Sequence, residues 1–586
     1  MEKKKREGKG QSFLKGAMVL GGSMVVVRLM GMVYKILLSG MYGGVGTGLF
    51  NAAYALYNPL FMLSTAGFPI AISRMVSESM TKKRYRDVKQ IHRLSVPIFV
   101  IAGLVCFIAM VIGSFIYVKI INADNTIFAL LCLSPTIFFG CLMSIYRGYF
   151  EGMRNMTPTA ISEIIEASCK LFIGFAASFI TMKLCMGQYY SSGYVLGIKC
   201  SGEAEANAAA VPLAIGAAIT GISLGSLFGF LFLFIRYKHK GDGIDSEDLN
   251  NSPPPRSNGT IMRTMVRTAI PIGLGSIIMS IGDMIDSTLV QTRIFNIMET
   301  DPDALLNVYG SLIPDEVFYG GDTHIYLYGC YGIALTLMML VTAVTQVFGT
   351  TALPSVTAAY TSGNKEKLKQ SMETVLRVTV LVTIPSGIGL SVLAEPLLSL
   401  IYSSPSVANE VEIGSKVLTV MGISVIFIAT STPLCSMLQA VGRMDVPLKL
   451  FTAGMIMKII VNYILVGIPE INIQGANVGS MVCYGFVTVV AMFVLCRRTG
   501  VIPDFMSILV KPLLASLLCG AAAYFSEILF DIVLMQSIAT ILSVIVAIIV
   551  YIISLLLLRA IKREDILQMP KGNKIVKVIE KRHLIR

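Results

Sequence analysis

Apolar runs long enough to cross a bilayer recur about fourteen times along this chain of 586 residues. A helix needs about 20 mostly apolar residues to span the hydrocarbon core of a membrane. Lipid offers no hydrogen bonds to the backbone, so spanning segments of this kind fold as helices. The runs are residues 13–39, 47–76, 94–118, 126–150, 158–182, 208–235, 265–290, 325–357, 375–402, 415–438, 450–468, 474–496, 507–526 and 536–558. They predict an all-α polytopic membrane protein with about 14 transmembrane helices.

The composition supports this class. Apolar residues make up 54% of the chain and charged residues 14%, and the mean hydropathy is +0.73. A net charge of +13 can indicate nucleic-acid binding, but the bases lie in short loops between apolar runs, as the positive-inside rule predicts. Outside we count only Lys119, Lys183, Lys199 and Arg293, with Lys416 at a border. We expect a protein of the cytoplasmic membrane with both termini in the cytoplasm and no nucleic-acid partner.

The chain also contains an internal repeat. STAGFPIAISRMVSE is followed by a basic loop, as is GTTALPSVTAAYTSG, and EGMRNMTP resembles AVGRMDVP at a similar spacing. Six runs per half give both copies the same direction, with an axis along the membrane normal. The predicted parts are a cytoplasmic tail 1–12, two six-helix lobes at 13–237 and 263–500, a polar linker 238–262, an appended helix pair 501–560 and a cytoplasmic tail 561–586.

Charged side chains within the apolar runs are the first candidates for a site. Arg28 lies near the middle of the first run, and Lys35 lies nearly two turns further along the same face. On the fifth run, Glu163, Glu166 and Lys170 form a charged stripe. An Arg at mid-membrane costs about 2.5–3.5 kcal/mol, so such a residue usually faces water or a partner. The alternative is a snorkelling Lys35, an Arg28 paired with one carboxylate and a Glu163 solvated at the membrane surface.

Three further charges extend this pattern to other runs. Lys458 lies at almost the place in the second half that Lys170 has in the first, and Asp283 and Asp286 share a face of the seventh run. Isolated charges are costly in lipid, so acids and bases on several helices favour one shared hydrated cavity.

Several kinds of chemistry are disfavoured. No P-loop signature occurs, so an intrinsic ATPase is not expected. The four histidines all fall in loops or tails, which argues against a histidine metal site: His92, His239, His324 and His583. The eleven cysteines lie mostly within apolar runs. Cys185 and Cys200 share one predicted outer loop and are the only two placed to form a disulfide, which we do not expect.

At its N-terminus the chain resembles a known family. FLKGAMVLGGSMVVVRLMGMVYKILLS, GVGTGLFNAAYALYNPLF and GFPIAISRMVSE are similar to the start of stage V sporulation protein B and the MurJ-type lipid II flippases. The tail REDILQMPKGNKIVKVIEK resembles theirs too. The resemblance implies the multidrug/oligosaccharidyl-lipid/polysaccharide (MOP) exporter fold, with two six-helix lobes in a V around a central cavity. It also implies that the final helix pair helps to form a groove for a polyprenyl tail.

The chain departs from the proteobacterial branch of that family. The branch has R-x-x-G-x-x-R-D in the first span, where this chain has Arg28, Gly31, Tyr34 and Lys35. An Arg expected midway along the second span is replaced near Phe61 or Met62. These differences suit the sporulation and Gram-positive branch, and leave open a cargo other than lipid II.

The resulting hypothesis is a transporter rather than an enzyme. It would flip a polyprenyl-diphosphate-linked saccharide, with lipid II as the first candidate, from the inner to the outer leaflet. The cations expected to meet the diphosphate are Arg28, Lys35, Lys170 and Lys458. The acids expected to balance the empty cavity, or to bind a coupling Na⁺ or H⁺, are Glu163, Glu166, Asp283 and Asp286. We expect no metal and no other cofactor, contact with membrane lipids, and a cell-wall polymerase as a candidate partner.

Three alternatives remain open. One is a flippase for another lipid-linked polysaccharide unit, and the second is a cation-coupled drug antiporter of the same superfamily. The third is a membrane glycosyltransferase or polymerase, which would need a catalytic acid at a loop edge. Glu316 and Asp322 are the candidates for that acid.

Overall fold

The computed structural model describes residues 13–65 and 67–560. The predicted tails, 1–12 and 561–586, lie outside the described residues. The contacts group the chain into two compact units, one of Met1–Thr292 with Pro314–Tyr326 and the other of Arg293–Ile313 with Leu327–Arg586. This division assigns the whole of the seventh predicted run, 265–290, to the first unit, whereas the repeat-based boundary at residue 263 stays a prediction.

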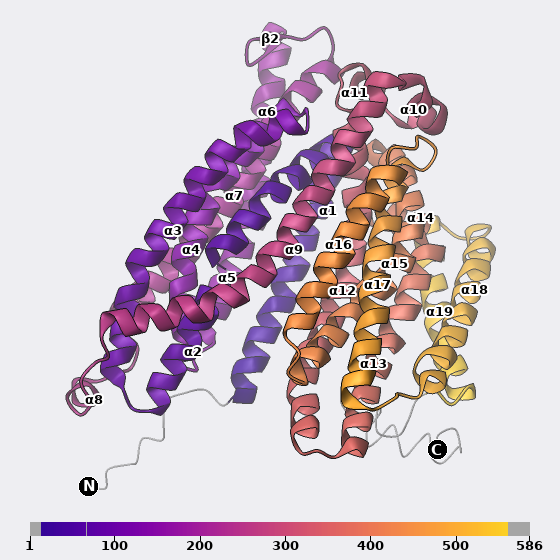
Figure 1. Cartoon of the computed structure of the whole chain (residues 1–586). Helices are drawn as coiled ribbons and strands as arrows, with labels where there is room; N and C mark the ends of the chain where they lie inside the picture. The colour runs from indigo at the N-terminus through magenta and orange to yellow at the C-terminus, as the bar shows by residue number, and fades with distance from the viewer. Residues whose placement is uncertain (1–12, 66, 561–586) are drawn as a thin grey trace. The chain divides into compact units, whose positions relative to one another are not determined.

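Long helices that run alongside one another make up the first unit, in which α4 packs against both α3 and α7 (Figure 1). Two antiparallel strands of two residues each place Tyr194 opposite Lys199. The elements are α1 (Phe13–Thr65), α2 (Phe68–Thr81), α3 (Tyr85–Ile120), η1 (Asp124–Thr126), α4 (Ile127–Gly152), α5 (Thr157–Cys169), the π-helical turn η2 (Lys170–Gly174), α6 (Phe175–Ser192), β1 (Tyr194–Val195), β2 (Ile198–Lys199), α7 (Glu203–Lys240), α8 (Ser246–Asn250), α9 (Asn258–Thr300) and α11 (Asp315–Tyr319).

The second unit is likewise helical. In it α15 packs against α13 and α17, and α18 pairs with α19. Its elements are α10 (Pro302–Tyr309), η3 (Gly310–Leu312), α12 (Thr323–Thr361), α13 (Lys365–Val392), α14 (Ala394–Ile401), η4 (Pro405–Val407), α15 (Ala408–Ala440), α16 (Asp445–Leu465), η5 (Asn472–Gln474), α17 (Gly475–Thr499), the π-helical turn η6 (Met506–Val510), α18 (Lys511–Asp531) and α19 (Gln536–Leu557).

Twelve helical stretches among the described residues are long and apolar enough to cross a membrane. The first, Val19–Thr81, covers most of the predicted run 13–39 and all of the run 47–76, while the run 265–290 is not among the twelve. The helical polytopic fold is therefore confirmed, and the count of fourteen is not. The two merged runs are separated at Gly43, whose φ of 58° and ψ of −153° break the helix. That backbone conformation is essentially restricted to glycine.

The internal repeat is visible in matching turns. At the first landmark of each half, Lys83 and Gly363 have positive φ, and at the second Arg154 and Gly442 do. At the second landmark the hydrogen bonds also match, since the amide of Asn155 or Arg443 donates to a carbonyl five residues earlier. The same helix ending thus recurs at corresponding places, as a repeat predicts.

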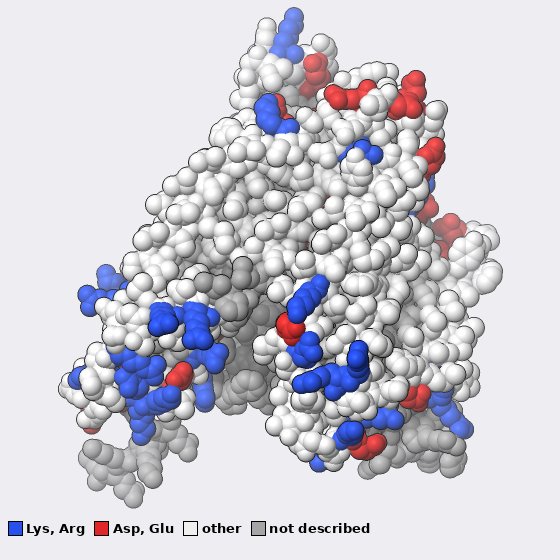
Figure 2. Space-filling model, viewed as in Figure 1, with Lys and Arg blue, Asp and Glu red and all other residues white. Residues whose placement is uncertain are grey.

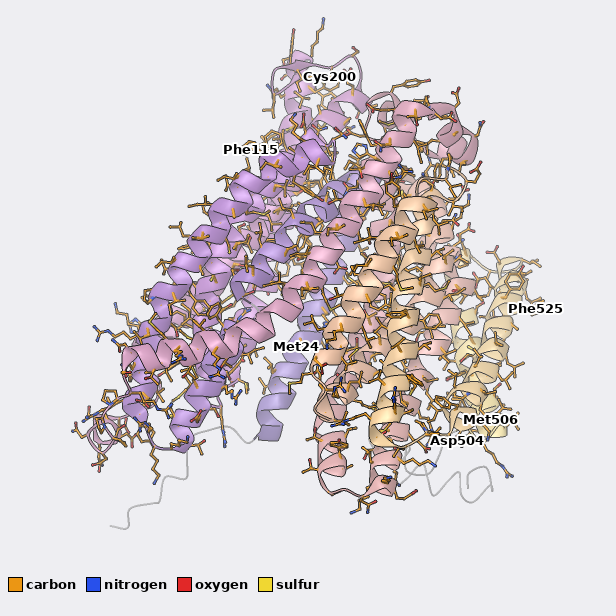
Figure 3. All side chains as sticks on the ribbon, in the orientation of Figure 1. Met24, Phe115, Cys200, Asp504, Met506 and Phe525 are labelled. Carbon is orange, nitrogen blue, oxygen red and sulfur yellow. The ribbon has the colours of Figure 1, made fainter. Side chains whose placement is uncertain are left out.

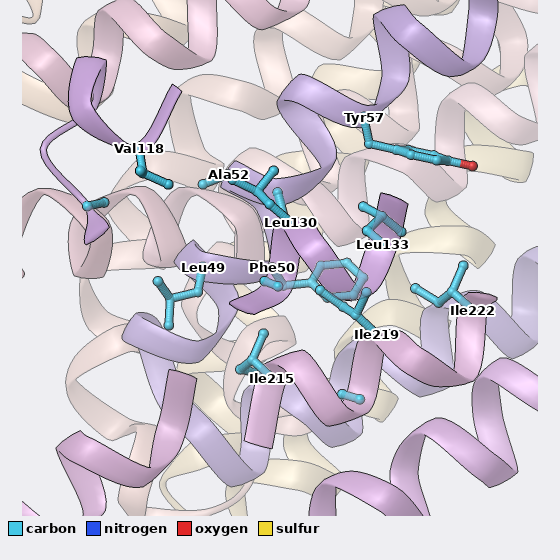
Figure 4. Packing of buried hydrophobic residues seen from close by; sticks show 14 of the residues in the cluster. Leu49, Phe50, Ala52, Tyr57, Val118, Leu130, Leu133, Ile215, Ile219 and Ile222 are labelled. Atoms are coloured by element: carbon cyan, nitrogen blue, oxygen red, sulfur yellow. The ribbon is translucent and has the colours of Figure 1, made fainter. Parts of the chain in front are cut away.

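Apolar side chains both fill the units and cover their outer faces. Figure 4 shows Leu49, Leu130 and Ile219 packed together in the first unit, where each is at most 1% exposed. On the outside, Phe115 of α3 is 56% exposed and Phe525 of α18 is 69% exposed (Figure 3). Exposed apolar faces of this extent suit contact with lipid tails.

Glycines on α7 let neighbouring helices approach closely. A Cβ added at Gly221 would lie 2.4 Å from Gly174 Cα, and one at Gly225 would lie 2.7 Å from the carbonyl oxygen of Glu166. Small residues at a four-residue spacing on α7 thus allow close helix packing. The contact fixes α5 and η2 against α7, and so positions the charged side chains that α5 and η2 carry.

The polar linker is tied to the first unit. Asp87, near the start of α3, is 1% exposed and accepts hydrogen bonds from Arg84 Nε at 2.6 Å and from the backbone amide of Arg256 at 2.9 Å. Arg86 Nε donates to the carbonyl of Leu249 at 2.9 Å. In Figure 2 many Lys and Arg side chains gather at this end of the unit, around α2, α3 and α8. The linker is thus bound along its length rather than free.

Asp242 provides a second attachment. Its carboxylate accepts hydrogen bonds from Lys89 Nζ at 2.6 Å, from the Tyr149 hydroxyl at 2.5 Å and from the Ile244 amide at 3.2 Å. Burial alone would raise the pKa of Asp242, but these hydrogen bonds and the Lys89 charge hold the pKa below its ordinary value. The ionised form therefore stabilises the attachment.

Asp242→Asn is expected to loosen the linker, because the amide cannot pair with Lys89. Hydrogen exchange of residues 241–257, read by mass spectrometry and corrected for intrinsic rates, should be faster in the variant at pH 7. A group whose pKa is lowered by folding stabilises above its unfolded pKa and loses that effect as pH falls through the folded value. The difference from wild type should therefore shrink below about pH 4. Glu247→Gln, an exposed acid on α8, is the control, and equal exchange in all three proteins would contradict the assignment.

Gly225→Ala is expected to destabilise the first unit by about 1–3 kcal/mol, the usual cost of overpacking a close contact. The added methyl group would press on the backbone carbonyl oxygen of Glu166, which cannot move aside by changing rotamer as a side chain can. Thermal unfolding of the protein in detergent measures this. Gly187→Ala on α6 is the matched control, because nothing lies within 4 Å of its added Cβ. Equal unfolding temperatures for the two variants would show that the α7 contact is not tight.

Candidate functional site

A cavity of about 340 Å³ in the first unit gathers charged side chains from three helices and the π-helical turn. Its charged lining is Arg28 from α1, Arg147 from α4, Glu163 and Glu166 from α5, and Lys170 from η2. The rest of the lining is Met24, Val27, Gly31, Tyr54, Tyr57, Phe61, Ala167 and Ile222. Three cations and two carboxylates thus share one mostly apolar recess, an arrangement typical of a site for a charged ligand.

Arg147 and Glu166 form an ion pair in this cavity. Arg147 Nη2 lies 3.0 Å from Glu166 Oε2, and Arg147 Nε donates to Ser162 Oγ at 2.9 Å. The hydroxyl of Ser226 donates to the other oxygen, Glu166 Oε1, at 3.1 Å. Both charges are therefore compensated by directed hydrogen bonds.

Lys170 is surrounded by aromatic rings, with Glu166 as a longer-range electrostatic partner. Its Nζ lies 5.0 Å from the ring centroid of Tyr34, 5.7 Å from that of Phe50 and 5.5 Å from that of Tyr54, and 3.5 Å from the Tyr54 hydroxyl. Within the described residues it has no ion pair. Cation–π attraction compensates an ammonium group only partly, so Lys170 keeps capacity for an anion. The π-helical turn that begins at Lys170 is a feature often found at functional sites.

The two remaining charges have different surroundings. Glu163 Oε2 accepts a hydrogen bond from Ser23 Oγ at 3.0 Å, which links α5 to α1. Arg28 lines the cavity with an exposed side chain. An incoming ligand can therefore reach Arg28 without displacing the packed core.

The structure brings together four of the eight residues predicted from the sequence: Arg28, Glu163, Glu166 and Lys170. Lys35 lies outside the cavity lining, with its Nζ 3.5 Å from Asn51 Oδ1 and 5.8 Å from the Phe50 ring centroid. The roles of these five residues in binding stay predictions.

The other three predicted residues are placed elsewhere. Asp283, exposed, and Asp286, half-buried, lie on α9 in the first unit and do not line this cavity. Lys458 lies on α16 in the second unit and is 6% exposed.

Sequence reasoning missed Arg147 and the aromatic part of the site. Arg147 falls within the predicted run 126–150, so the argument applied to Arg28, a base inside an apolar run, could have identified it. The aromatic contacts of Lys170 carry no such signal, because Tyr34, Phe50 and Tyr54 look like ordinary apolar positions in the sequence.

Metal binding, disulfide formation and acid catalysis each need a particular arrangement of side chains. In the part of the chain that the structure describes, no three His, Cys, Asp or Glu side chains are grouped so as to hold a metal ion. Cys185 and Cys200 lie in one apolar cluster as free thiols. Glu316 is exposed on α11, whereas burial raises the pKa of Asp322, opposed by a hydrogen bond from Asn125.

Comparison with known proteins gives matches in both halves. The family described as polysaccharide biosynthesis protein matches residues 13–202, and the MatE family matches residues 329–464. The lipid II flippase MurJ of Bacillus subtilis (strain 168) is 22% identical over 490 residues, which are 81% of this chain and 82% of that protein. Stage V sporulation protein B of the same organism is 23% identical over 475 residues, 80% of each chain.

Solved structures of similar fold include an inward closed conformation of the lipid II flippase MurJ. It aligns with a TM-score of 0.58 and 15% identity over 92% of this chain and 98% of its own. An inward-facing multidrug resistance MATE transporter of the MOP superfamily aligns with a TM-score of 0.55 and 14% identity over 83% of this chain and 99% of its own. The chain is therefore a homologue of MurJ and stage V sporulation protein B, and it has the fold of the MOP superfamily transporters.

Proposed function

We propose that this protein is a flippase for a polyprenyl-diphosphate-linked saccharide, with lipid II as the first candidate for its cargo. The observation that carries the proposal is the cavity with Arg28, Arg147 and Lys170 in a membrane-spanning unit. The homology to MurJ supports the class of cargo. No bond in the cargo has to be made or broken, so the protein acts as a transporter rather than an enzyme.

A diphosphate fits the charge of this cavity. It carries roughly two negative charges, and charge-assisted hydrogen bonds from Arg and Lys to phosphate are about twice as strong as neutral ones. Arg28 offers an exposed guanidinium, and Lys170 offers an ammonium that forms no ion pair with the described residues. A guanidinium can bind phosphate oxygens in a bidentate manner, whereas an ammonium acts as a point charge.

Glu166 takes the place of the cargo when the site is empty. It neutralises Arg147 at 3.0 Å, and the diphosphate would compete with it for the same guanidinium. Arg147 thereby joins Arg28 and Lys170 in binding the loaded state. Glu163 and Glu166 keep the net charge of the empty cavity near zero. This lowers the free-energy cost of reorienting the unloaded transporter in the membrane. Coupling of these acids to Na⁺ or H⁺ is a further part of the proposal.

We place the protein in the cytoplasmic membrane with both termini and the linker on the cytoplasmic side. The gathering of Lys and Arg around α2, α3 and α8 supports this orientation (Figure 2). Transport then proceeds from the inner to the outer leaflet. A cell-wall polymerase that uses the flipped product is a proposed partner.

A cation-coupled drug antiporter is the second candidate, and the MatE match at 329–464 favours it. The charge of the cavity argues against it. A cationic drug would have to approach three cations, and one of the two carboxylates is already bound to Arg147. Uptake of a cationic dye into the same vesicles distinguishes the two functions.

Arg28→Ala is expected to lower transport about ten- to a hundredfold. A hydrogen bond to a charged group contributes about 1.5–3 kcal/mol, and each 1.4 kcal/mol is a factor of ten. The assay is flipping of a polyprenyl-diphosphate disaccharide with a fluorophore on the sugar, followed by quenching of the outer leaflet of proteoliposomes. Lys119→Ala is the control, because Lys119 is a solvent-exposed base outside the cavity that pairs with Asp124 at 2.8 Å. Full transport by the Arg28 variant, or transport of the cationic dye alone, would overturn the proposal.

Glu166→Gln should separate binding from turnover. The amide is a poor partner for Arg147, so the guanidinium becomes available to the diphosphate, and binding should tighten about three- to tenfold. Turnover should fall, because the empty cavity carries an extra positive charge. Equilibrium binding in nanodiscs and flipping in proteoliposomes measure the two effects, with Glu395→Gln, an exposed acid on α14, as the control. Weaker binding in the Glu166 variant would mean that Glu166 contacts the cargo directly rather than competing with it.

A further inference from the structure

Four aromatic side chains follow one another along the second segment of α1. Phe50, Tyr54, Tyr57 and Phe61 are spaced by four, three and four residues, so they share one helix face. Successive ring centroids are 4.7, 5.5 and 5.1 Å apart. We call these four residues the aromatic ladder. Its first ring, Phe50, is 2% exposed and belongs to the packed core (Figure 4).

The other three rings also line the charged cavity, although Tyr57 belongs to the same core cluster and Tyr54 and Phe61 pack against it. Tyr54 directs its hydroxyl toward Lys170 at 3.5 Å. The ladder therefore begins beside a proposed phosphate-binding cation and continues along the same wall of the cavity. Such a wall places aromatic surface next to an anion site. Binding of a diphosphate alone does not need this aromatic surface.

The hydroxyl of Tyr57 is the second observation. Tyr57 is 7% exposed and lines the cavity, and among the described residues its hydroxyl has no hydrogen-bond partner. In Figure 4 that hydroxyl points away from Leu49 and Phe50. The hydroxyl is not among the buried polar atoms that lack a hydrogen bond, so it is accessible from the cavity. A tyrosine ring with an accessible hydroxyl combines an apolar surface with a polar group, and this place on the wall therefore suits a ligand that carries hydroxyls.

We propose that Tyr54, Tyr57 and Phe61 form a subsite for the sugar next to the diphosphate of the cargo. A pyranose ring has an apolar face of C–H groups, which can lie on aromatic rings, and a rim of hydroxyls, which can bond to Tyr57. Sites of this kind combine aromatic surface with a few placed polar groups. This inference rests on the proposed function, and it adds that the protein distinguishes a glycosylated polyprenyl diphosphate from a bare one.

The position of Phe61 is set by α4. A Cβ added at Gly140 would lie 2.6 Å from Phe61 Cε2, so the absence of a side chain at Gly140 makes room for the ring. Gly140→Ala should therefore displace the Phe61 ring without changing the identity of any residue that lines the cavity. This offers a variant that tests the geometry of the subsite separately from its chemistry.

The test compares two probes bound to the purified protein in nanodiscs: a polyprenyl diphosphate and the same lipid bearing one hexosamine. Wild type should prefer the glycosylated probe by about tenfold. Tyr57→Phe should reduce that preference about three- to tenfold, as expected for one hydrogen bond, and Phe61→Leu and Gly140→Ala should reduce it as well. Arg28→Ala should weaken binding of both probes equally. Phe115→Leu, on the outer face of α3, should change neither.

The outcomes separate this inference from the proposed function. If wild type binds neither probe, the proposed function fails, and this inference fails with it. If wild type binds both probes equally well, the diphosphate site stands and the sugar subsite is overturned. If Tyr57→Phe and Phe61→Leu weaken both probes to the same extent, the rings only support the cavity and the subsite is again overturned. Thermal unfolding of each variant is measured alongside, and Tyr57→Phe, which removes one oxygen atom, tests the subsite even if the other variants unfold.

Discussion

Charge placed inside a membrane-spanning unit has to be paired, stacked or hydrated, and the cavity of the first unit combines these solutions. Arg147 is paired with Glu166, Lys170 is held against three aromatic rings, and Arg28 is exposed to the cavity. Full pairing of every charge would leave a stable but inert interior. The incomplete compensation of Lys170 is what makes this region suitable for binding an anion that arrives from outside the protein.

This arrangement depends on how closely α5 and η2 approach α7. Gly221 and Gly225 remove the side chains that would keep these backbones apart, and the contact brings Ser226 of α7 within hydrogen-bond distance of Glu166. The charged stripe of α5 is therefore positioned by residues that carry no charge. The electrostatics of the cavity therefore depend on the packing of small residues.

The cavity also explains why one fold can serve different cargoes. Transporters that share the MOP fold differ in what they carry, so the fold does not identify the substrate. In this chain the sign of the uncompensated charge favours an anion, and the adjoining rings of Tyr54, Tyr57 and Phe61 favour a group with both an apolar face and hydroxyls. A glycosyl diphosphate has both features.

From the sequence alone, the helical membrane fold, the repeated halves and four cavity residues could be predicted. These features follow from local patterns: the length of apolar runs determines the spans, and helical spacing places Glu163, Glu166 and Lys170 on one face. Tertiary structure decided the pairing of Arg147 with Glu166 and the aromatic surroundings of Lys170. It also decided the attachment of the linker to α3 and α4, through Asp87 on α3 and through Asp242 of the linker itself. Each of them joins residues on different elements, and a lone apolar or charged position does not specify which distant backbone will approach it. For the same reason, the prediction that Asp283 and Asp286 line the same cavity was not met. Charged residues inside different membrane-spanning helices need not face the same cavity.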